Sequence, residues 1–307
     1  MNVLRAVLLA ASESTWLREQ LTRRPFFRRS VARFMPGERL EDALRATMEL
    51  RAHGIGTLVT QLGENVTTTT ESADVGAHYL DALQQIADGR HDALVSVKLT
   101  QLGLDLGVDG CLDHVLRVAR RAGPDRMVWI DMEASRYVDA TLEVFRRARS
   151  ELPNIGLCLQ AYLYRTAADL EALLPLGPAI RLVKGAYREP KDIAYARKRD
   201  VDDNFERLAA RLLDPAAQRA GAFAGLATHD GALIERLTRL VSDTAAARFD
   251  FEMLFGIQVP LQRRLVKQGL PLRVLISYGP SWFPWYMRRL AERPANVWFV
   301  ARNLFSS

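Results

Sequence analysis

Two adjacent arginines near the end of the chain are the residues whose chemistry is easiest to read in this sequence. Arg288 and Arg289 follow a strand-like run and an aromatic cluster within the segment 273–303. Each guanidinium presents a planar fork of hydrogen-bond donors, so two of them near the start of a helix suit a small carboxylate or phosphate. The pair therefore predicts a small anionic substrate.

Three more charged residues interrupt runs that are otherwise apolar. Lys98 lies in VSVKLT, Asp131 in VWIDME and Arg181 in RLVKGAY. Burying an unpaired charge is costly, so each must meet an opposite charge or a ligand. Asp131 is a natural partner for Lys98 or Arg181, and the sequence leaves open whether Lys98 serves a structural ion pair or a ligand.

Eight short apolar runs alternate with longer segments of helical period from residue 54 onward. Nearly continuous apolar runs are typical of strands buried on both faces of a parallel sheet, and apolar residues recurring every three or four positions indicate helices. Eight such units predict an α/β fold, a closed (β/α)8 TIM-like barrel. The runs are 55–62, 93–100, 127–133, 155–161, 179–185, 222–229, 249–255 and 272–278.

The remaining segments complete this prediction. Residues 1–50 are expected to form an N-terminal helical arm of the same domain, and 51–307 the catalytic barrel. The arm includes an amphipathic helix that ends at Gly54. Helices are also predicted at 74–87, 111–122, 141–151, 202–213, 233–240 and 281–291. The insertion 188–213 is expected to cover the barrel mouth, and the four threonines at 67–70 to form a polar loop.

Composition excludes several classes of protein. The 307 residues carry a net charge of +6, but this charge is scattered, which argues against a nucleic-acid partner. The densest basic stretch, 23–33, is interleaved with phenylalanines; packing on its own domain is favoured over membrane contact. Two cysteines are too few for a disulfide framework and match no zinc site, so a reduced, cytoplasmic setting is expected. We find no transmembrane span or signal peptide.

Active sites of such barrels lie at the carboxyl ends of the strands. The polar residues there exceed what folding needs, and Gly185 with Ala186 leaves room for a ligand to approach the backbone. These strand-end residues are Gln61, Glu64, Lys98, Asp131, Glu133, Gln160, Lys184, Thr228, His229, Glu252 and Tyr278.

Several chemistries known in such barrels are compatible with these strand-end residues. A Schiff-base lyase would use a desolvated lysine such as Lys98 or Lys184. A metal hydrolase would need clustered histidines, and five in the whole chain argue against a metal site. A flavin oxidoreductase would use cationic and amide groups such as Arg181, Lys184 and Gln160.

The ordered motifs resemble those of bacterial monofunctional proline dehydrogenases, from about residue 40 to 303. They are LGENV at 62–66, VSVKLTQLG at 95–103, IDME at 130–133, LQAY at 159–162, RLVKGAYREPK at 181–191, ATHD at 227–230, FEMLFG at 251–256 and FPWYMRRLAERPANV near the end. So many motifs in one order make a chance resemblance very improbable.

The resemblance implies an FAD-containing barrel that oxidises L-proline to Δ1-pyrroline-5-carboxylate by hydride transfer to flavin N5. It also implies that the electrons pass to a membrane quinone, so peripheral contact with the inner face of the membrane is an expectation. It leaves the oligomeric state open. No nucleic-acid partner or metal is implied.

The resemblance also assigns roles to matching positions. Lys98, Arg288 and Arg289 would hold the proline carboxylate, and Glu64 would pair with Arg288 as a gate. Tyr187 and Leu254 would pack against the substrate ring. Asp131 and Arg181 match positions treated as catalytic. The positions that match flavin contacts are Met132, Gln160, Lys184, Gly185, Ala186, Thr228 and His229.

One position departs from the family pattern. Leu275 stands where the family usually has a tyrosine over the proline ring. Loss of that aromatic hydroxyl changes the pocket next to the ring, so hydroxyproline dehydrogenase is retained as the near alternative. A Schiff-base aldolase on the same scaffold is less favoured.

Overall fold

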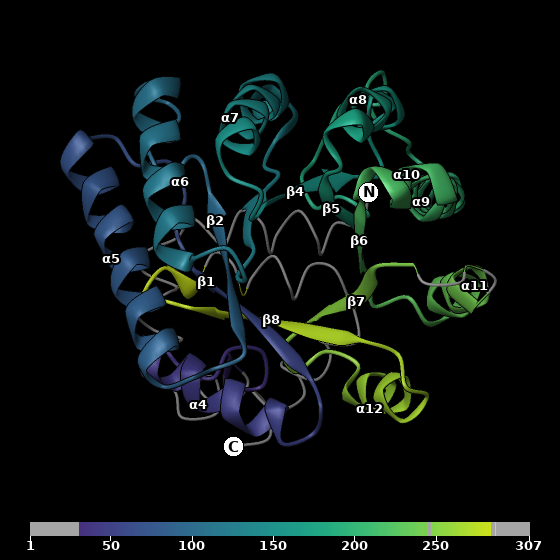
Figure 1. Ribbon diagram of the computed structural model, residues 1–307, viewed down its shortest axis with the longest axis horizontal. Coiled ribbons are helices and arrows are strands. Elements are labelled where there is room, and N and C mark those ends of the chain that lie inside the picture. The colour runs from purple at the N-terminus through teal and green to yellow at the C-terminus, as the bar shows by residue number, and fades with distance from the viewer. Residues whose placement is uncertain (1–30, 243, 245–246, 284–285, 287–307) are drawn as a thin grey trace, which may run out of the picture.

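Eight parallel strands pair in sequence order and close into a barrel, because β1 also pairs with β8 (Figure 1). The computed structural model describes residues 31–242, 244, 247–283 and 286. The strands are β1 Gly56–Gln61, β2 Ala93–Lys98, β3 Val128–Asp131, β4 Ile155–Gln160, β5 Ala179–Val183, β6 Phe223–Ala227, β7 Phe249–Leu254 and β8 Leu272–Tyr278. The predicted barrel is confirmed, and each strand begins within one residue and ends within two of the predicted run.

Helices surround the strands and bury the outer face of the barrel (Figure 1). Those at 74–87, 111–122, 141–151, 202–213 and 233–240 were predicted. Three that were not, α8, α10 and α12, are the shortest α-helices described and offer too few turns for a clear period. The α-helices are α4 Leu40–Arg51, α5 Thr69–Asp88, α6 Val108–Ala122, α7 Val138–Glu151, α8 Thr166–Leu173, α9 Lys198–Leu213, α10 Pro215–Ala220, α11 Gly231–Ser242 and α12 Val259–Lys267.

The prediction of a polar loop at 67–70 was wrong for Thr69 and Thr70, which are the first residues of α5, while Thr67 precedes the helix and Thr68 is its N-cap. The helix begins through a capping box, in which Thr68 Oγ1 accepts a hydrogen bond from Glu71 N at 3.2 Å. The Glu71 carboxylate in turn accepts from the backbone N–H of Thr67 at 2.7 Å and of Thr68 at 3.2 Å. These bonds satisfy donors that a helix start leaves free.

The insertion after β5 divides into two parts, and only the first lies at the mouth. Its helical part, α9, packs on α11, β5 and β6 as an outer-layer helix, with Phe205 fully buried. The preceding loop crosses toward β3 and β4: Ser135 N and Oγ donate to Glu189 at 2.8 and 2.6 Å, and Ala194 bridges to Leu163. The prediction that the whole insertion covers the mouth was therefore wrong for α9.

Residues 31–38 pack against the segment that follows β8. The Phe34 ring is buried and its centroid lies 6.1 Å from that of Tyr286. Trp282 Nε1 donates a hydrogen bond to Glu38 at 2.8 Å. The described start of the chain therefore holds the segment leading towards residues 287–307. Within the part of the chain that is described, every helix is too short or too polar to cross a lipid bilayer.

Candidate active site

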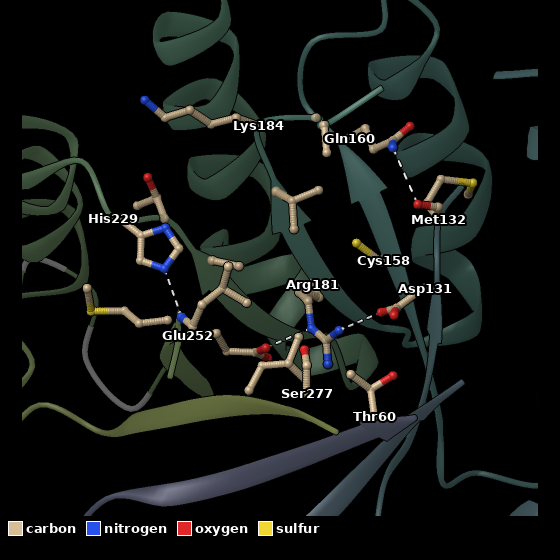
Figure 2. A pocket seen from close by; sticks show the side chains of 18 of the residues that line it. Thr60, Asp131, Met132, Cys158, Gln160, Arg181, Lys184, His229, Glu252 and Ser277 are labelled. Atoms are coloured by element: carbon tan, nitrogen blue, oxygen red, sulfur yellow. Dashed lines mark hydrogen bonds and ion pairs between the residues drawn. The ribbon is translucent and has the colours of Figure 1, made fainter. Parts of the chain in front are cut away.

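A cavity of about 730 Å³ opens among the carboxyl ends of the strands. Figure 2 shows side chains from several strands and the loops after them pointing into it. Arg288 and Arg289 lie outside the described residues. All the other residues to which the family resemblance assigns a role line this cavity: Glu64, Lys98, Asp131, Met132, Gln160, Arg181, Lys184, Gly185, Ala186, Tyr187, Thr228, His229, Leu254 and Leu275. Of the strand-end residues, Gln61, Glu133 and Tyr278 do not line it.

Arg181 is the central cation of this cavity, and two carboxylates hold it from opposite sides (Figure 2). Its Nη1 donates to Asp131 Oδ1 at 2.9 Å, and its Nε lies 2.7 Å from Glu252 Oε2 as an ion pair without good hydrogen-bond geometry. Burial disfavours the charged guanidinium, but Glu252 and Asp131 outweigh it and raise the pKa of Arg181. The guanidinium is therefore a fixed positive charge.

The surroundings of one face of this guanidinium, and of its second terminal nitrogen, bear on its role. Its central carbon lies 4.7 Å from the centroid of the Trp129 ring, a cation–π contact. Its Nη2 is buried and has no hydrogen-bond partner among the residues that the structure describes. A buried donor left unpaired costs free energy, so Arg181 is arranged to donate one more hydrogen bond to a ligand.

Lys98 lies at the edge of the same charge cluster. Its Nζ is 3.6 Å from Asp131 Oδ2, while Ser96 Oγ donates to Asp131 Oδ1 at 2.7 Å. Asp131 therefore partners both Lys98 and Arg181, which joins two pairings that the sequence left as alternatives. At 3.6 Å the lysine is not committed to a short hydrogen bond with Asp131, and its ammonium remains available to a ligand.

Glu252 was read as a polar strand end but was given no role in the site. The signal for such a role was present in the FDFEM segment, where acidic residues alternate with buried apolar ones. This alternation places Phe251 and Met253 in the outer core and Glu252 inside the barrel. Sequence reasoning also missed Thr60, Ser96, Cys158 and Ser277, which face the interior as small groups without a motif.

Lys184 follows β5, and its ammonium reaches away from the cavity centre (Figure 2). Its Nζ contacts Asp202 of α9 and lies 2.9 Å from Asp230 Oδ2, just before α11. Lys198 Nζ contacts the same two carboxylates. Lys184 therefore lies in an ion-pair network at the rim, which fixes the β5 loop to two outer helices.

This network makes the stability of the rim depend on pH. Burial opposes ionisation of Asp230, but hydrogen bonds from Lys184 and Lys198 outweigh it and hold the pKa of Asp230 well below its ordinary 3.8. A depressed carboxyl pKa stabilises the folded state above the unfolded pKa and loses that contribution as pH falls. We expect Asp230→Asn to reduce the free energy of unfolding at neutral pH. The difference in this free energy between the variant and the unmodified protein should become smaller below about pH 4. Urea denaturation as a function of pH measures it.

The exposed carboxylate of Asp113 provides the control for this pH dependence, because its side chain lies 3.9 Å from Arg117 on the outside of α6. Asp113→Asn should change the free energy of unfolding by less than about 0.5 kcal/mol at any of these pH values. A gap between Asp230→Asn and the unmodified protein that stays constant down to acidic pH would contradict the assignment.

Two predicted cofactor contacts have definite partners in the structure. His229 lines the cavity, and its Nε2 accepts a hydrogen bond from Leu254 N at 2.8 Å (Figure 2). Gln160 Nε2 donates to Met132 O at 3.4 Å, while its Oε1 is buried without a hydrogen-bond partner among the described residues. Gln160 therefore offers an acceptor to a ligand.

Gly185 has a different reason for being glycine from the one predicted. Its φ of +118° is one that side chains rarely adopt, and a Cβ there would lie 2.3 Å from the Tyr162 ring. Packing of Tyr162 and the turn itself therefore require glycine. Close approach of a ligand is not needed to explain it, although Gly185 and Ala186 do line the cavity.

Comparison with known proteins adds to this geometry. The family model described as proline dehydrogenase matches residues 43–302. "Proline dehydrogenase 1" of Bacillus subtilis subsp. natto is 36% identical over 282 residues, which cover 90% of this chain and 91% of that one. "Proline dehydrogenase" of Deinococcus radiodurans is 34% identical over 301 residues, 93% of each chain.

Solved structures share the fold at lower identity. Proline utilization A (PutA) from Bdellovibrio bacteriovorus, inactivated by N-propargylglycine, aligns with a TM-score of 0.82 at 22% identity. The alignment covers 99% of this chain but 38% of that one. PutA from Corynebacterium freiburgense aligns with a TM-score of 0.75 at 24% identity and covers 97% and 34%. The chain thus spans little more than a third of these larger proteins.

Proposed function

This chain belongs to the proline dehydrogenase family, and from that premise we propose that it oxidises L-proline to Δ1-pyrroline-5-carboxylate with FAD as its cofactor. The observation that carries the proposal is Arg181, a buried guanidinium that lines a large cavity and whose Nη2 is unpaired among the described residues. FAD would supply a two-electron acceptor for the hydride that leaves the carbon next to the amine.

The cavity contains groups that fit a flavin ring. Arg181 Nη2 is a fixed donor and Gln160 Oε1 a fixed acceptor, and both are buried without a hydrogen-bond partner in the described part of the chain. A flavin ring system carries carbonyl acceptors and an N–H donor, which are the groups that a free donor and a free acceptor would bind. A cation at the ring also stabilises the negative charge that reduction places on it. We propose that these two residues, with Met132, Ala186, Thr228 and His229, hold the cofactor.

The substrate carboxylate requires a separate set of cations. We propose that Lys98, Arg288 and Arg289 bind it, with Glu64 as a gate that pairs with Arg288. Charge-assisted hydrogen bonds contribute about 1.5 to 3 kcal/mol each, so three of them fix the carboxylate in one orientation. Tyr187 and Leu254 line the cavity and would contact the ring of the bound proline. In this orientation the substrate carbon that is bonded to the amine nitrogen would be held in position to lose a hydride to the cofactor.

We further propose that the electrons pass from the reduced cofactor to a membrane quinone. The family resemblance supports this proposal. The basic stretch 23–33 is the candidate for contact with the membrane surface; Phe34, immediately beyond it, is buried. Sedimentation with vesicles of anionic lipid, with and without quinone, would test both parts of the proposal.

The proposed oxidation is tested by the spectrum of the purified protein. We expect a flavin absorbance that L-proline bleaches under anaerobic conditions and that added quinone restores. A colourless protein that FAD cannot reconstitute would contradict the flavin assignment. Borohydride trapping of substrate on Lys98 or Lys184 would support the Schiff-base alternative.

Leu275 supports hydroxyproline as a second candidate substrate. It lies on β8, lines the cavity, and pairs in register with Leu254, one of the proposed ring contacts. We expect Leu275→Tyr to change the ratio of L-proline to 4-hydroxyproline turnover by about tenfold, because a group that gains or loses a hydrogen bond alters discrimination by at least that much. Anaerobic bleaching with both substrates measures the ratio.

Leu58 provides the control, because it pairs with Leu275 across the β1–β8 register and is fully buried. Leu58→Ile keeps its volume and should leave the ratio of the two substrates unchanged. An unchanged ratio in Leu275→Tyr would show that position 275 does not determine specificity.

A further inference from the structure

A second cavity, of about 410 Å³, lies at the amino-terminal end of the barrel, and the proposed reaction does not use it. Its mouth includes the exposed residues Gly54, Asp92 and Asp125, so it opens to solvent. Its inner wall includes Trp129, the ring that supports Arg181 from below. This lower cavity and the upper, substrate-side cavity therefore approach each other inside the barrel.

Two carboxyl groups on β7 connect the cavities. Glu252 lines the upper cavity and Asp250 lines the lower one. The residues are two apart on one strand, so their side chains leave the same face about 7 Å apart. Gly225 on the adjacent strand makes room for this pair, because a Cβ there would lie 2.6 Å from Glu252 Oε1.

Asp250, Glu252 and the side chains around them include more carboxyl groups than cations. Arg273 Nε lies 3.1 Å from Asp250 Oδ2, and its Nη1 lies 3.3 Å from Asp92 Oδ1. Arg181 pairs with Glu252 and Asp131 as described above. The groups that face the pair are the cations Lys98, Arg181 and Arg273, the carboxylates Asp92 and Asp131, and the Cys158 thiol. With Asp250 and Glu252 included, four carboxylates face three cations.

Each carboxyl of the pair also has one unsatisfied oxygen. Glu252 Oε1 and Asp250 Oδ1 are buried and have no hydrogen-bond partner among the described residues. An ionised, buried oxygen without a donor is costly, whereas a protonated carboxyl is neutral. Burial, and next the charge of Glu252, raise the pKa of Asp250 well above its ordinary 3.8, and burial raises the pKa of Glu252 too. Geometry and charge thus agree that one proton stays within the pair.

We propose that Asp250 and Glu252 hold one proton between them and exchange protons between the upper cavity and the solvent-open lower cavity. The source of the proton rests on the proposed function. A substrate secondary ammonium loses its N–H proton to the Glu252 carboxylate, which gains an O–H bond. Asp250, the acid at rest, releases its own proton to water in the lower cavity and takes the one from Glu252. The amine becomes neutral, and the pair returns to its starting state.

Infrared titration of the protein without substrate tests the held proton. At neutral pH we expect a carboxylic-acid C=O band that shifts in D2O. Asp250→Asn and Glu252→Gln should each abolish the band, because either change leaves three carboxylates facing three cations. Asp92→Asn alters neither carboxyl of the pair. The Asp92 side chain is 52% exposed, so its charge is screened by solvent and its removal should lower the pH at which the band disappears without abolishing the band.

Glu133→Gln is the matched control. Glu133 is buried and accepts hydrogen bonds from Thr100 N and Oγ1 at 3.1 and 2.6 Å, away from the pair. Burial also raises the pKa of Glu133, so this variant removes any acid band that Glu133 contributes, and it should retain the band that Asp250→Asn abolishes. Absence of the band in the unmodified protein, or its persistence in both Asp250→Asn and Glu252→Gln, overturns the proposal. If Asp250→Asn does not fold, Glu252→Gln and Asp92→Asn provide the test.

Proton exchange is tested by the rate at which L-proline bleaches the flavin. Asp250→Asn should slow bleaching about 100-fold, within the range of acid–base contributions, while the L-proline concentration giving half-maximal rate stays unchanged. Bleaching at the unmodified rate, together with loss of the infrared band, overturns the exchange. The infrared result needs no substrate, so failure of the unmodified protein to bleach would count against the proposed function alone.

Discussion

Arg181→Met is expected to lower the free energy of unfolding by about 3 to 5 kcal/mol, because removing one member of a buried ion pair leaves its partners uncompensated. Arg181 has a side chain only 4% exposed, and it contacts both Asp131 and Glu252. Methionine keeps the apolar stem of the side chain but removes its charge, which leaves the buried Glu252 and the largely buried Asp131 without this cation. Equilibrium denaturation in urea measures the loss. Flavin content should fall as well, because the proposed donor to the ring is gone.

Arg165→Met is the matched control for this loss. Arg165 also contacts two carboxylates, Asp139 at 2.6 Å and Asp169 at 2.8 Å, but its side chain is 41% exposed. Surface pairs of this kind contribute about 0 to 1 kcal/mol, so this variant should remain close to the unmodified protein. Equal losses in the two variants would show that burial of Arg181 is not the cause.

Lys98→Met is expected to raise the KM for L-proline about 10- to 150-fold while leaving flavin content near normal. The range corresponds to the loss of one charge-assisted hydrogen bond of about 1.5 to 3 kcal/mol to the substrate carboxylate. The fold should tolerate the change, because Asp131 keeps its contacts with Arg181 and Ser96. Steady-state kinetics with a quinone acceptor measure KM. Arg288→Met and Arg289→Met should act in the same direction.

Lys267→Met is the control for this experiment. Lys267 is exposed at the end of α12 and does not line the cavity. Its replacement removes the same charge without approaching the proposed site, so KM should not change. Loss of flavin in Lys98→Met with an unchanged KM would place Lys98 at the cofactor instead of the substrate.

The barrel could be predicted because its strands are buried on both faces, which leaves a run of apolar residues that the sequence displays directly. The charged exceptions in those runs were equally visible, and Lys98, Asp131 and Arg181 do meet in one cluster. Glu252 was harder to interpret. Its place in the site depends on which carboxylate reaches Arg181 from a strand that is not its neighbour in the sheet, and spacing along one strand cannot show this.

Other differences have the same origin in contacts between distant segments. Gly185 is glycine because the Tyr162 ring occupies the space of a side chain, and Lys184 turns outward because Asp202 and Asp230 lie on helices beyond the strand. Neither contact leaves a periodic signal. Thr68 differs: its capping box with Glu71 is a local motif that the sequence displayed.

Closure of the barrel through β1 and β8 has a consequence for synthesis of the chain. The first strand pairs with the last, in a register that runs from Gly56 with Arg273 to Gln61 with Tyr278. On the ribosome, β1 must therefore wait until more than 200 further residues have emerged before it finds its second neighbour. Until then the nascent sheet has two open edges, which are surfaces prone to pairing with other chains. Chaperone protection during translation would matter most in this interval.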